Sequence, residues 1–462
     1  MILIKNFMKT NRFTTILFAV TLFFCSSCTK DWLNKKPDIS LVVPSSLTDF
    51  QALLDNTLNA FNSGNSAFGE IGSDNYYLTS TTYATLPANS QNAYIWDLNT
   101  YSTGSAPGWS AAYTQVYYAN VVLSGLNGVN VSVSNVNEFN NVKGSALFYR
   151  GFAYYDMSQI FAKPYDSNTS GTDLGLPLRT IPNLVSNQPR ATVAATYAFI
   201  INDLKTAINL LPVTPMYKTR PSKPAAYGLL ARLYLSMSDY NNAYLYADSC
   251  LQLYNTLIPY STFNLTSSTP IPEYNDEVIF SNVCNDKTFQ SSNPIIDSNL
   301  YASYNNNDLR KTVFFKLTQG VPHLFGRYTG NTITLFDGLA VDEIFMIRAE
   351  AGARLGNLDN AMGDLNTLLA TRWAPGTYSP FIAGTSAQTL AIILQERRKE
   401  LCFRCLRWSD LRRLNKDPNY AITLIRLFNG QTYTLKPNDN RYVYQIPALE
   451  TLYNSDIIQN PL

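Results

Sequence analysis

The chain contains a single histidine, His323, among its 462 residues. Histidine is the side chain most often used as a metal ligand and as a general base near neutral pH, so one copy excludes most schemes of both kinds. The sequence also lacks the G-x-S-x-G, G-x-G-x-x-G, G-x-x-x-x-G-K and H-E-x-x-H motifs. Hydrolysis by two carboxylates needs no local motif, but nothing singles out a pair, and we expect no enzyme.

Charge is scarce and balanced. Charged residues make up 15% of the chain, with 35 basic and 33 acidic side chains. Binding of nucleic acid by charge requires a basic patch or stripe, which this balance does not supply. The composition therefore gives no support for a nucleic-acid-binding protein.

Cysteines are also few. After residue 28 only Cys250, Cys284, Cys402 and Cys405 remain. Cys402-Phe-Arg-Cys405 has redox or zinc spacing, but it has no second pair and only one histidine to join it. We interpret these cysteines as core or incidental. An exported protein can form disulfides, but four cysteines make no disulfide framework.

Long apolar runs are limited to the N-terminus. Lys5, Lys9 and Arg12 precede an apolar run at 13–24, and Ser26-Ser27-Cys28 follows it. The run is shorter than the roughly 20 residues that span a membrane, and it fits a secretory signal. Small residues before a cysteine predict a bacterial lipobox, with residues 1–27 removed and Cys28 lipidated. The alternative is ordinary signal cleavage, with Cys28 a bystander.

Residues 342–372 predict a helical hairpin. Ile344, Ile347, Ala351 and Leu355 recur at helical spacing, and Gly356-Asn357 then interrupts the pattern. Asp359 is expected to cap a second helix, and small residues at Ala349 and Ala361 would let the two helices approach closely. This is the pattern of a tetratricopeptide hairpin.

Residues 225–255 repeat the hairpin, with Ser238-Asp239-Tyr240 in place of Gly356-Asn357-Leu358. A single hairpin cannot bury its apolar face alone, so several are expected to stack. We therefore predict an all-α scaffold of such hairpins at about 109–256 and 339–415, carrying large, irregular, partly β inserts. Further helical patterns begin after Ser46 or Thr48 and cover 109–126, 145–161, 192–211 and, as one long helix, 385–414.

The inserts, at about 59–108 and 257–338, are rich in Asn, Ser, Thr and Tyr and keep no helical period. Long irregular stretches in compact proteins are usually functional or disordered, and the aromatic content argues against disorder. Aromatic rings among amide and hydroxyl groups suit a surface that binds sugars, or a peptide groove. The alternative is that the rings pack the inserts onto the helices. We expect the two inserts to form one face, with these ligand-binding candidates: Asp74, Tyr76, Tyr77, Trp96, Tyr101, Tyr301 and Tyr304.

Weaker patterns receive structural interpretations. Residues 166–171 start like a calcium loop, but Pro177 stands where the closing glutamate belongs, so we predict a turn. Glu396 and Glu400 share a helix face with adjacent arginines, which favours ion pairs over a catalytic dyad. The alternating runs 277–282 and 331–336 are expected to pair as strands, and 442–446 resembles a strand.

In this order, several weak motifs resemble the SusD/RagB family of Bacteroidetes outer-membrane nutrient-binding lipoproteins, over nearly the whole chain after Cys28. The matching segments are Asp31-Trp32-Leu33, Trp109 with Tyr113 and Asn120, 146–150, 220–226 with 230–234, 347–351, 396–401 with 407–412, Ile446-Pro447 and Gln459-Asn460-Pro461. One departure is Arg404-Cys405, where the family usually has Glu-Gly.

The resemblance implies a single SusD-like domain over 28–462, built on a tetratricopeptide scaffold. It also implies a lipid anchor at Cys28 and an outward-facing position on the outer membrane. It further implies a SusC-like TonB-dependent transporter as partner. We expect no cofactor and no metal site. Ligands in the family are mostly glycans, with peptides in the RagB branch. The expected function is capture of oligosaccharide for a transporter. The alternatives are a peptide-binding RagB-like protein, a tetratricopeptide scaffold for protein partners, and a glycan-degrading enzyme with two carboxylates in its cleft.

Overall fold

The computed structural model describes residues 44–57, 59–63, 67–101, 107–183 and 187–461. The expected signal sequence and Cys28 lie outside the described residues. Residues 45–462 form one compact unit. None of its described helices is both long and apolar enough to cross a membrane.

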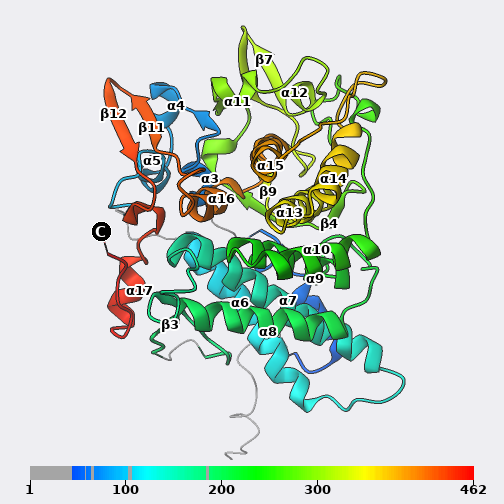
Figure 1. Ribbon diagram of the computed structural model, residues 1–462. Helices are drawn as coiled ribbons and strands as arrows, with labels where there is room; N and C mark the ends of the chain where they lie inside the picture. The colour runs from blue at the N-terminus through cyan, green and yellow to red at the C-terminus, as the bar shows by residue number, and fades with distance from the viewer. Residues whose placement is uncertain (1–43, 58, 64–66, 102–106, 184–186, 462) are drawn as a thin grey trace, which may run out of the picture. The chain divides into compact units, whose positions relative to one another are not determined.

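A stack of helices forms the scaffold, as predicted from the helical periods (Figure 1). Each helix packs on its neighbour in the chain from α6 to α10, and α13 joins α10 to α14 and α15. The prediction of an all-α fold with irregular inserts is confirmed. The scaffold helices are α6 (Pro107–Gly125), α7 (Val136–Phe161), α8 (Val193–Leu210), α9 (Lys223–Ser236), α10 (Tyr240–Leu253), α13 (Val341–Arg354), α14 (Leu358–Ala370), α15 (Ser386–Glu400) and α16 (Arg407–Leu414).

The two predicted hairpins share one turn geometry. In each, a residue with positive φ precedes the residue that caps the second helix: Ser238 (φ 60°) before Asp239, and Gly356 (φ 85°) before Asn357. The alanines at the helix contacts, Ala349 and Ala361, are buried, which allows the close approach expected from their size. The prediction that Asp359 caps the second helix is wrong, because α14 begins at Leu358 and Asp359 lies in its first turn.

The long helix predicted over 385–414 is two helices, α15 and α16. Residues 401–406 separate them, and Phe403 (φ 58°) and Cys405 (φ 57°) have left-handed backbones that no α-helix accepts. Neither residue is a glycine, so the sequence gives no ordinary sign of the break.

Outside the stack the inserts contain short elements. The remaining helices are α2 (Leu47–Leu54), α3 (Phe68–Ile71), α4 (Ser80–Ala84), α5 (Ala88–Tyr94), α11 (Ser298–Ala302), α12 (Arg310–Val313) and α17 (Ala448–Tyr453). The strands are β1 (Tyr76–Tyr77), β2 (Leu174–Pro177), β3 (Arg190–Thr192), β4 (Val278–Phe280), β5 (Val283–Asn285), β6 (Ile295–Ile296), β7 (Phe315–Thr318), β8 (Val321–Leu324), β9 (Thr334–Phe336), β10 (Leu339–Ala340), β11 (Leu424–Phe428) and β12 (Gln431–Leu435).

Strand pairing joins the two inserts. The first insert supplies β1 and the second supplies β6 to one four-stranded sheet, ordered β1-β6-β8-β7, with Tyr76 opposite Ile296. The runs 277–282 and 331–336 each contain a strand, and each strand pairs with a different partner: β4 with β10, and β9 with β5. The strand expected at 442–446 is absent from the described structure, where Asn440–Tyr442 forms a 3-10 turn instead.

Candidate functional site

Four of the predicted ligand residues lie in the core. Tyr76, Trp96, Tyr101 and Tyr304 are each less than a tenth exposed. Trp96 Nε1 donates to the Gly72 carbonyl at 2.9 Å, and the Tyr304 hydroxyl donates to the Lys399 carbonyl at 2.8 Å. The prediction that these rings stack on ligand is therefore corrected: they pack the inserts onto the helices, which was the alternative considered from the sequence.

The other three predicted residues are linked through the insert surface, which we define as Asp74, Tyr77, Asp297, Tyr301 and Arg398. Tyr77 is 46% exposed and stands opposite Ile295 in the sheet. Arg398 Nη2 lies 3.2 Å from Asp74 and 3.8 Å from Asp297, which caps α11, the helix that carries Tyr301. The structure thus brings together candidates from both inserts.

Charge on the insert surface is already compensated. Arg407 contacts Asp74 at 2.7 Å, so although burial raises the pKa of Asp74, Arg407 and Arg398 together hold that pKa below its ordinary value. Lys311 Nζ lies 5.1 Å from the centre of the Tyr301 ring. Tyr301 is partly buried, so Tyr77 is the better exposed of the two rings on this surface.

A larger hollow lies between the first insert and the C-terminal hairpin. This groove, of about 760 Å³, is lined by Ile95, Trp96, Asp97, Leu98 and Asn99 on one side and by Tyr433, Asn438, Asp439, Asn440 and Arg441 on the other. Asp97, Leu98, Asn99, Asn438 and Asn440 are exposed, and Tyr433 is half-buried. A space of this size accepts a small ligand, and the lining combines a ring and an apolar side chain with amides and charges.

Arg426 on β11 fixes both walls of the groove. Its guanidinium lies 3.8 Å from the centre of the Tyr94 ring and 4.6 Å from that of Trp96, and it donates to the carbonyls of Tyr94 and Ser73. Tyr433 pairs with Arg426 across the hairpin, so both side chains lie on one face of the ribbon. Figure 1 shows β11 and β12 beside α4 and α5, which agrees with this clamp.

Tyr433 and Arg441 line the groove but are not among the binding residues predicted from the sequence. A signal existed: Asn429-Gly430 lies between two alternating runs, and Asn-Gly is the strongest short-range sign of a tight hairpin. Both residues have positive φ, 50° and 75°, as that turn requires. The hairpin could therefore have been predicted, but not its position beside Trp96.

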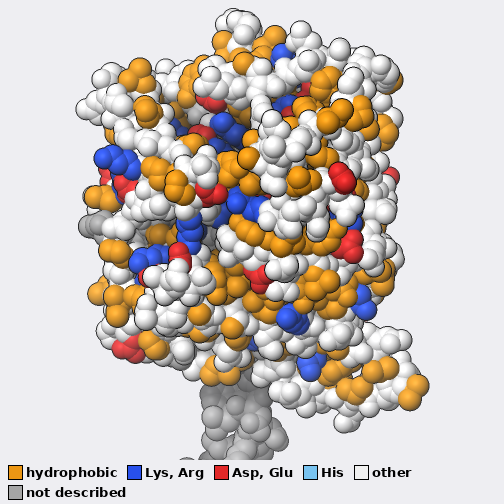
Figure 2. Space-filling model, viewed as in Figure 1, with side chains coloured by type: hydrophobic (Ala, Val, Ile, Leu, Met, Phe, Trp, Pro, Cys, Tyr) orange, Lys and Arg blue, Asp and Glu red, His pale blue; other side chains and the backbone are white. Residues whose placement is uncertain are grey.

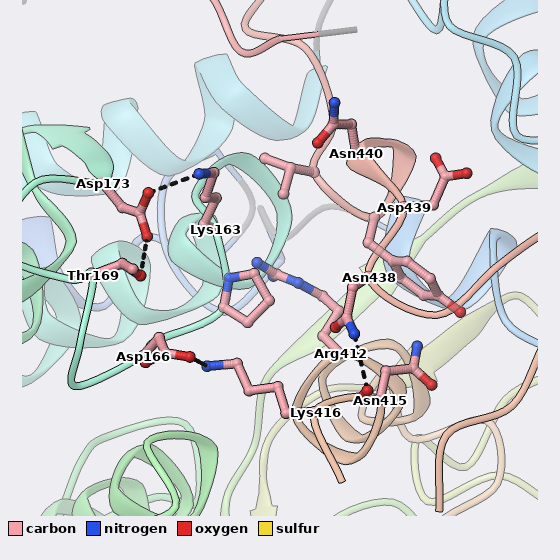
Figure 3. Close-up of a pocket in the computed structure, with 13 residues that line it drawn as sticks. Lys163, Asp166, Thr169, Asp173, Arg412, Asn415, Lys416, Asn438, Asp439 and Asn440 are labelled. Carbon is pink, nitrogen blue, oxygen red and sulfur yellow. Dashed lines mark hydrogen bonds and ion pairs between the residues drawn. The ribbon is translucent and has the colours of Figure 1, made fainter. Parts of the chain in front are cut away.

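A second pocket shares the wall Asn438–Asn440 with the groove and encloses about 250 Å³ (Figure 3). Its charges pair internally: Lys163 with Asp173 at 2.7 Å and Lys416 with Asp166 at 3.0 Å. Arg412 lies between these pairs in Figure 3 and donates to the Ser158, Gln159 and Ala162 carbonyls at the end of α7. Burial lowers the pKa of Arg412 to about 10. We interpret this guanidinium as the C-terminal cap of α7.

Glu396 and Glu400 of α15 form buried ion pairs in the core. Arg310 binds Glu396 at 2.5 Å and Glu400 at 3.0 Å, and Arg372 binds Glu400 at 2.7 Å. These carboxylates are buried and occupied by arginines, as the structural interpretation predicts. Within the described ranges, no cluster of three or more His, Cys, Asp or Glu side chains could hold a metal. On the face drawn in Figure 2, basic and acidic side chains lie intermixed.

Stacked helical hairpins that carry aromatic, polar inserts define a helical-repeat protein with an open groove outside the repeats. Two family models match this chain. Residues 31–235 match one described as "Starch-binding associating with outer membrane", and residues 341–462 match one described as "SusD family". The chain belongs to the SusD/RagB family.

Individual relatives agree with this assignment. SusD-like protein P2 of Formosa agariphila is 26% identical over 251 residues, which are 51% of this chain and 45% of that relative, so the match spans less than half of the relative's length. A crystal structure of a putative sugar binding protein from Bacteroides vulgatus is 21% identical, with a TM-score of 0.75 over 91% of this chain and 99% of that one. A SusD superfamily protein from Bacteroides thetaiotaomicron is 20% identical, with a TM-score of 0.73 over 90% and 100%. Identities this low establish the fold alone.

Proposed function

We propose that this protein is a lipid-anchored nutrient-binding protein that captures oligosaccharide in the groove between residues 95–99 and the β12 hairpin. The observation that carries the proposal is the lining of that groove, where the Tyr433 ring stands among exposed amides and charges. A sugar presents C–H faces to rings and hydroxyl groups to amides and carboxylates. Binding in this way breaks no bond, and we infer that the protein is not an enzyme.

The family assignment supports the remaining parts of the proposal. One matching model is described as starch-binding and associated with the outer membrane, and two structural relatives from Bacteroides vulgatus are called sugar or carbohydrate binding proteins. We infer that acyl chains on Cys28 anchor this chain to the outer membrane, facing outward, and that it delivers ligand to a SusC-like TonB-dependent transporter. Two or more acyl chains make a stable anchor.

The proposal predicts that Tyr433→Ala weakens oligosaccharide binding about tenfold, equivalent to about 1.4 kcal/mol. Purified protein lacking residues 1–28 would be titrated with a panel of glycans and peptides by calorimetry. Tyr433 suits this test because it is half-buried in a surface hairpin. Trp96→Ala does not, since the buried indole supports the fold.

Tyr77→Ala is the matched control, because Tyr77 is an exposed tyrosine on the insert surface. Unchanged binding by Tyr77→Ala together with weaker binding by Tyr433→Ala places the ligand in the groove. The reverse result would move the ligand to the insert surface and contradict the groove. Binding of peptides alone would replace the glycan proposal with the RagB-like one, and binding of neither would favour a scaffold for protein partners.

A further inference from the structure

Two cysteines from distant parts of the chain meet in the structure. Cys284 lies in β5 of the second insert and Cys405 in the connection between α15 and α16, and their Sγ atoms are 2.8 Å apart. Cys284 is 1% exposed. Two sulfur atoms this close are nearer than ordinary non-bonded contact allows and lie within a small adjustment of bonding distance. Sequence spacing draws attention to Cys402 and Cys405 instead.

The other two cysteines have different surroundings. Cys250 Sγ contacts the Pro224 carbonyl at 3.2 Å, and Cys402 Sγ lies 3.6 Å from the Tyr304 hydroxyl. Both are buried in the core. The contact between Cys284 and Cys405 is therefore specific to one pair among the four cysteines of residues 45–462.

The backbone at Cys405 strengthens the case. Its φ of 57° falls in the left-handed region, which costs most residues about 1–2 kcal/mol and costs glycine almost nothing. A cysteine at this position therefore has a conformational cost that a glycine would not have. What its side chain adds is the contact with Cys284.

We propose that Cys284 and Cys405 form a disulfide in the exported protein, made by exchange with a disulfide-bearing oxidant. One Sγ–Sγ bond forms, the two thiols lose two protons and two electrons, and the disulfide of the oxidant is reduced to two thiols. This proposal rests on export through an oxidising compartment and not on glycan binding, so either can fail without the other.

Burial sets when this bond forms. The pKa of the Cys405 thiol lies well above its ordinary value, because it shares a hydrogen bond with Cys284 and is partly shielded from water. The thiolate is the reactive form, so exchange in the folded protein is slow. We expect oxidation to occur during folding, before β5 is covered.

The bond would join an insert to the scaffold. β5 pairs with β9 in the second insert, and the adjacent Val283 N–H donates to the Asn62 carbonyl of the first insert at 3.0 Å. Cys405 belongs to the connection that leads into α16, next to Arg404, which binds Asp342 of α13 at 2.8 Å. A covalent link here would fix both inserts against the helices that carry them.

The test is disulfide mapping of the full-length protein purified from the envelope of an exporting host. Unfolded protein would be alkylated without reduction and digested with trypsin and a glutamate-specific protease, which separate all four cysteines. We expect a linked pair of peptides, 278–287 and 405–407, with Cys250 and Cys402 alkylated. Alkylation of all four cysteines, or a link that joins any other pair, would overturn the proposal.

Stability gives a second readout. Reduction and alkylation of the wild type are expected to lower Tm by about 3–5 °C. The disulfide would close a long loop and so restrict the unfolded chain, and breaking it removes that restriction. Cys284→Ser should lower Tm similarly and make it insensitive to reductant, whereas Cys250→Ser, also buried, should keep the sensitivity. A reductant effect that persists in Cys284→Ser would refute the link. If Cys284→Ser does not fold, the peptide map of the wild type still decides.

Discussion

Glu70 is a carboxylic acid held in the core. It lies in α3, is 1% exposed, and Oε1 accepts hydrogen bonds from Ser73 at 3.2 Å and Asn75 at 3.1 Å. Burial raises its pKa from 4.5 to about 7, against the lowering effect of the two hydrogen bonds. Below pH 4.5 this group is protonated in both the folded and the unfolded states. Between pH 4.5 and 7 the unfolded state ionises first, so the free energy of unfolding falls as pH rises.

We therefore predict that Glu70→Gln removes a pH-dependent loss of stability. In the wild type this residue lowers the free energy of unfolding by up to about 3 kcal/mol between pH 5 and pH 8. The glutamine variant cannot ionise and should lose correspondingly less over the same range. Urea unfolding at both pH values measures the difference. Glu138→Gln, at an exposed glutamate of α7, is the control; an equal change in both variants would refute the role of Glu70.

For single residues, the sequence predicts which residue types form the inserts, but not the direction in which each side chain points. The aromatic inserts were predicted as functional, yet neighbouring Tyr76 and Tyr77 point in opposite directions, 3% and 46% exposed. A strand alternates its side chains between two faces, and which face is buried depends on the partner strand. That partner, β6, lies in the other insert, so local sequence could not choose between the two tyrosines.

Two glycines near one hairpin turn, Gly356 and Gly363, have different backbone conformations. Gly356 ends the first helix with φ of 85°, whereas Gly363 lies inside α14, and a Cβ at either position would meet no atom within 4 Å. Steric clashes are thus absent at both sites, and only backbone conformation distinguishes them.

We predict opposite effects of alanine at these two positions. Gly356→Ala should lower the free energy of unfolding by about 1 kcal/mol, because alanine resists the left-handed region. Gly363→Ala should raise it by about 0.5–1 kcal/mol, because alanine favours a helix interior. Chemical denaturation of both variants beside the wild type measures the signs. Changes of the same sign would show that the turn geometry described for the hairpin is incorrect.

Elements with many helical periods were predictable, and short or interrupted ones were not. Both hairpins follow from apolar spacing and turn residues, whereas the break between α15 and α16 depends on left-handed Phe403 and Cys405. Tertiary contacts hold those backbones, such as Arg404 with Asp342. The strands of the second insert span two to four residues each, too short for a period to identify their partners.

Across the molecule, buried ion pairs tie the second insert to the helical scaffold. Arg372, at the end of the second hairpin, is fully buried and binds both oxygens of Glu277 from the second insert, at 2.9 and 2.8 Å. Its Nε also binds Glu400 of α15, which binds Arg310 in turn. The sequence predicted ion pairs on α15 but could not supply Glu277 and Arg310 as members, because both lie in the second insert. The groove was likewise missed, because it forms between segments far apart in sequence.

This network predicts that the insert and the helices unfold together. In Glu277→Gln the carboxylate that accepts hydrogen bonds from Arg372 is replaced by an amide, whose NH2 group can only donate. We expect this change to lower the free energy of unfolding by about 3–5 kcal/mol. Because Arg372 also binds Glu400, that cost falls on the scaffold and on the insert alike. Far-ultraviolet circular dichroism reports the helices, and pulsed hydrogen exchange of the β4 and β9 peptides reports the second insert. Both should show one transition, displaced equally to lower temperature. Asp276→Asn, at the exposed neighbouring position, should leave it unchanged. If the β4 and β9 peptides of Glu277→Gln lost their protection at a lower temperature while the helical transition stayed unmoved, the insert would be a separate folding unit that the ion pairs do not couple to the helices.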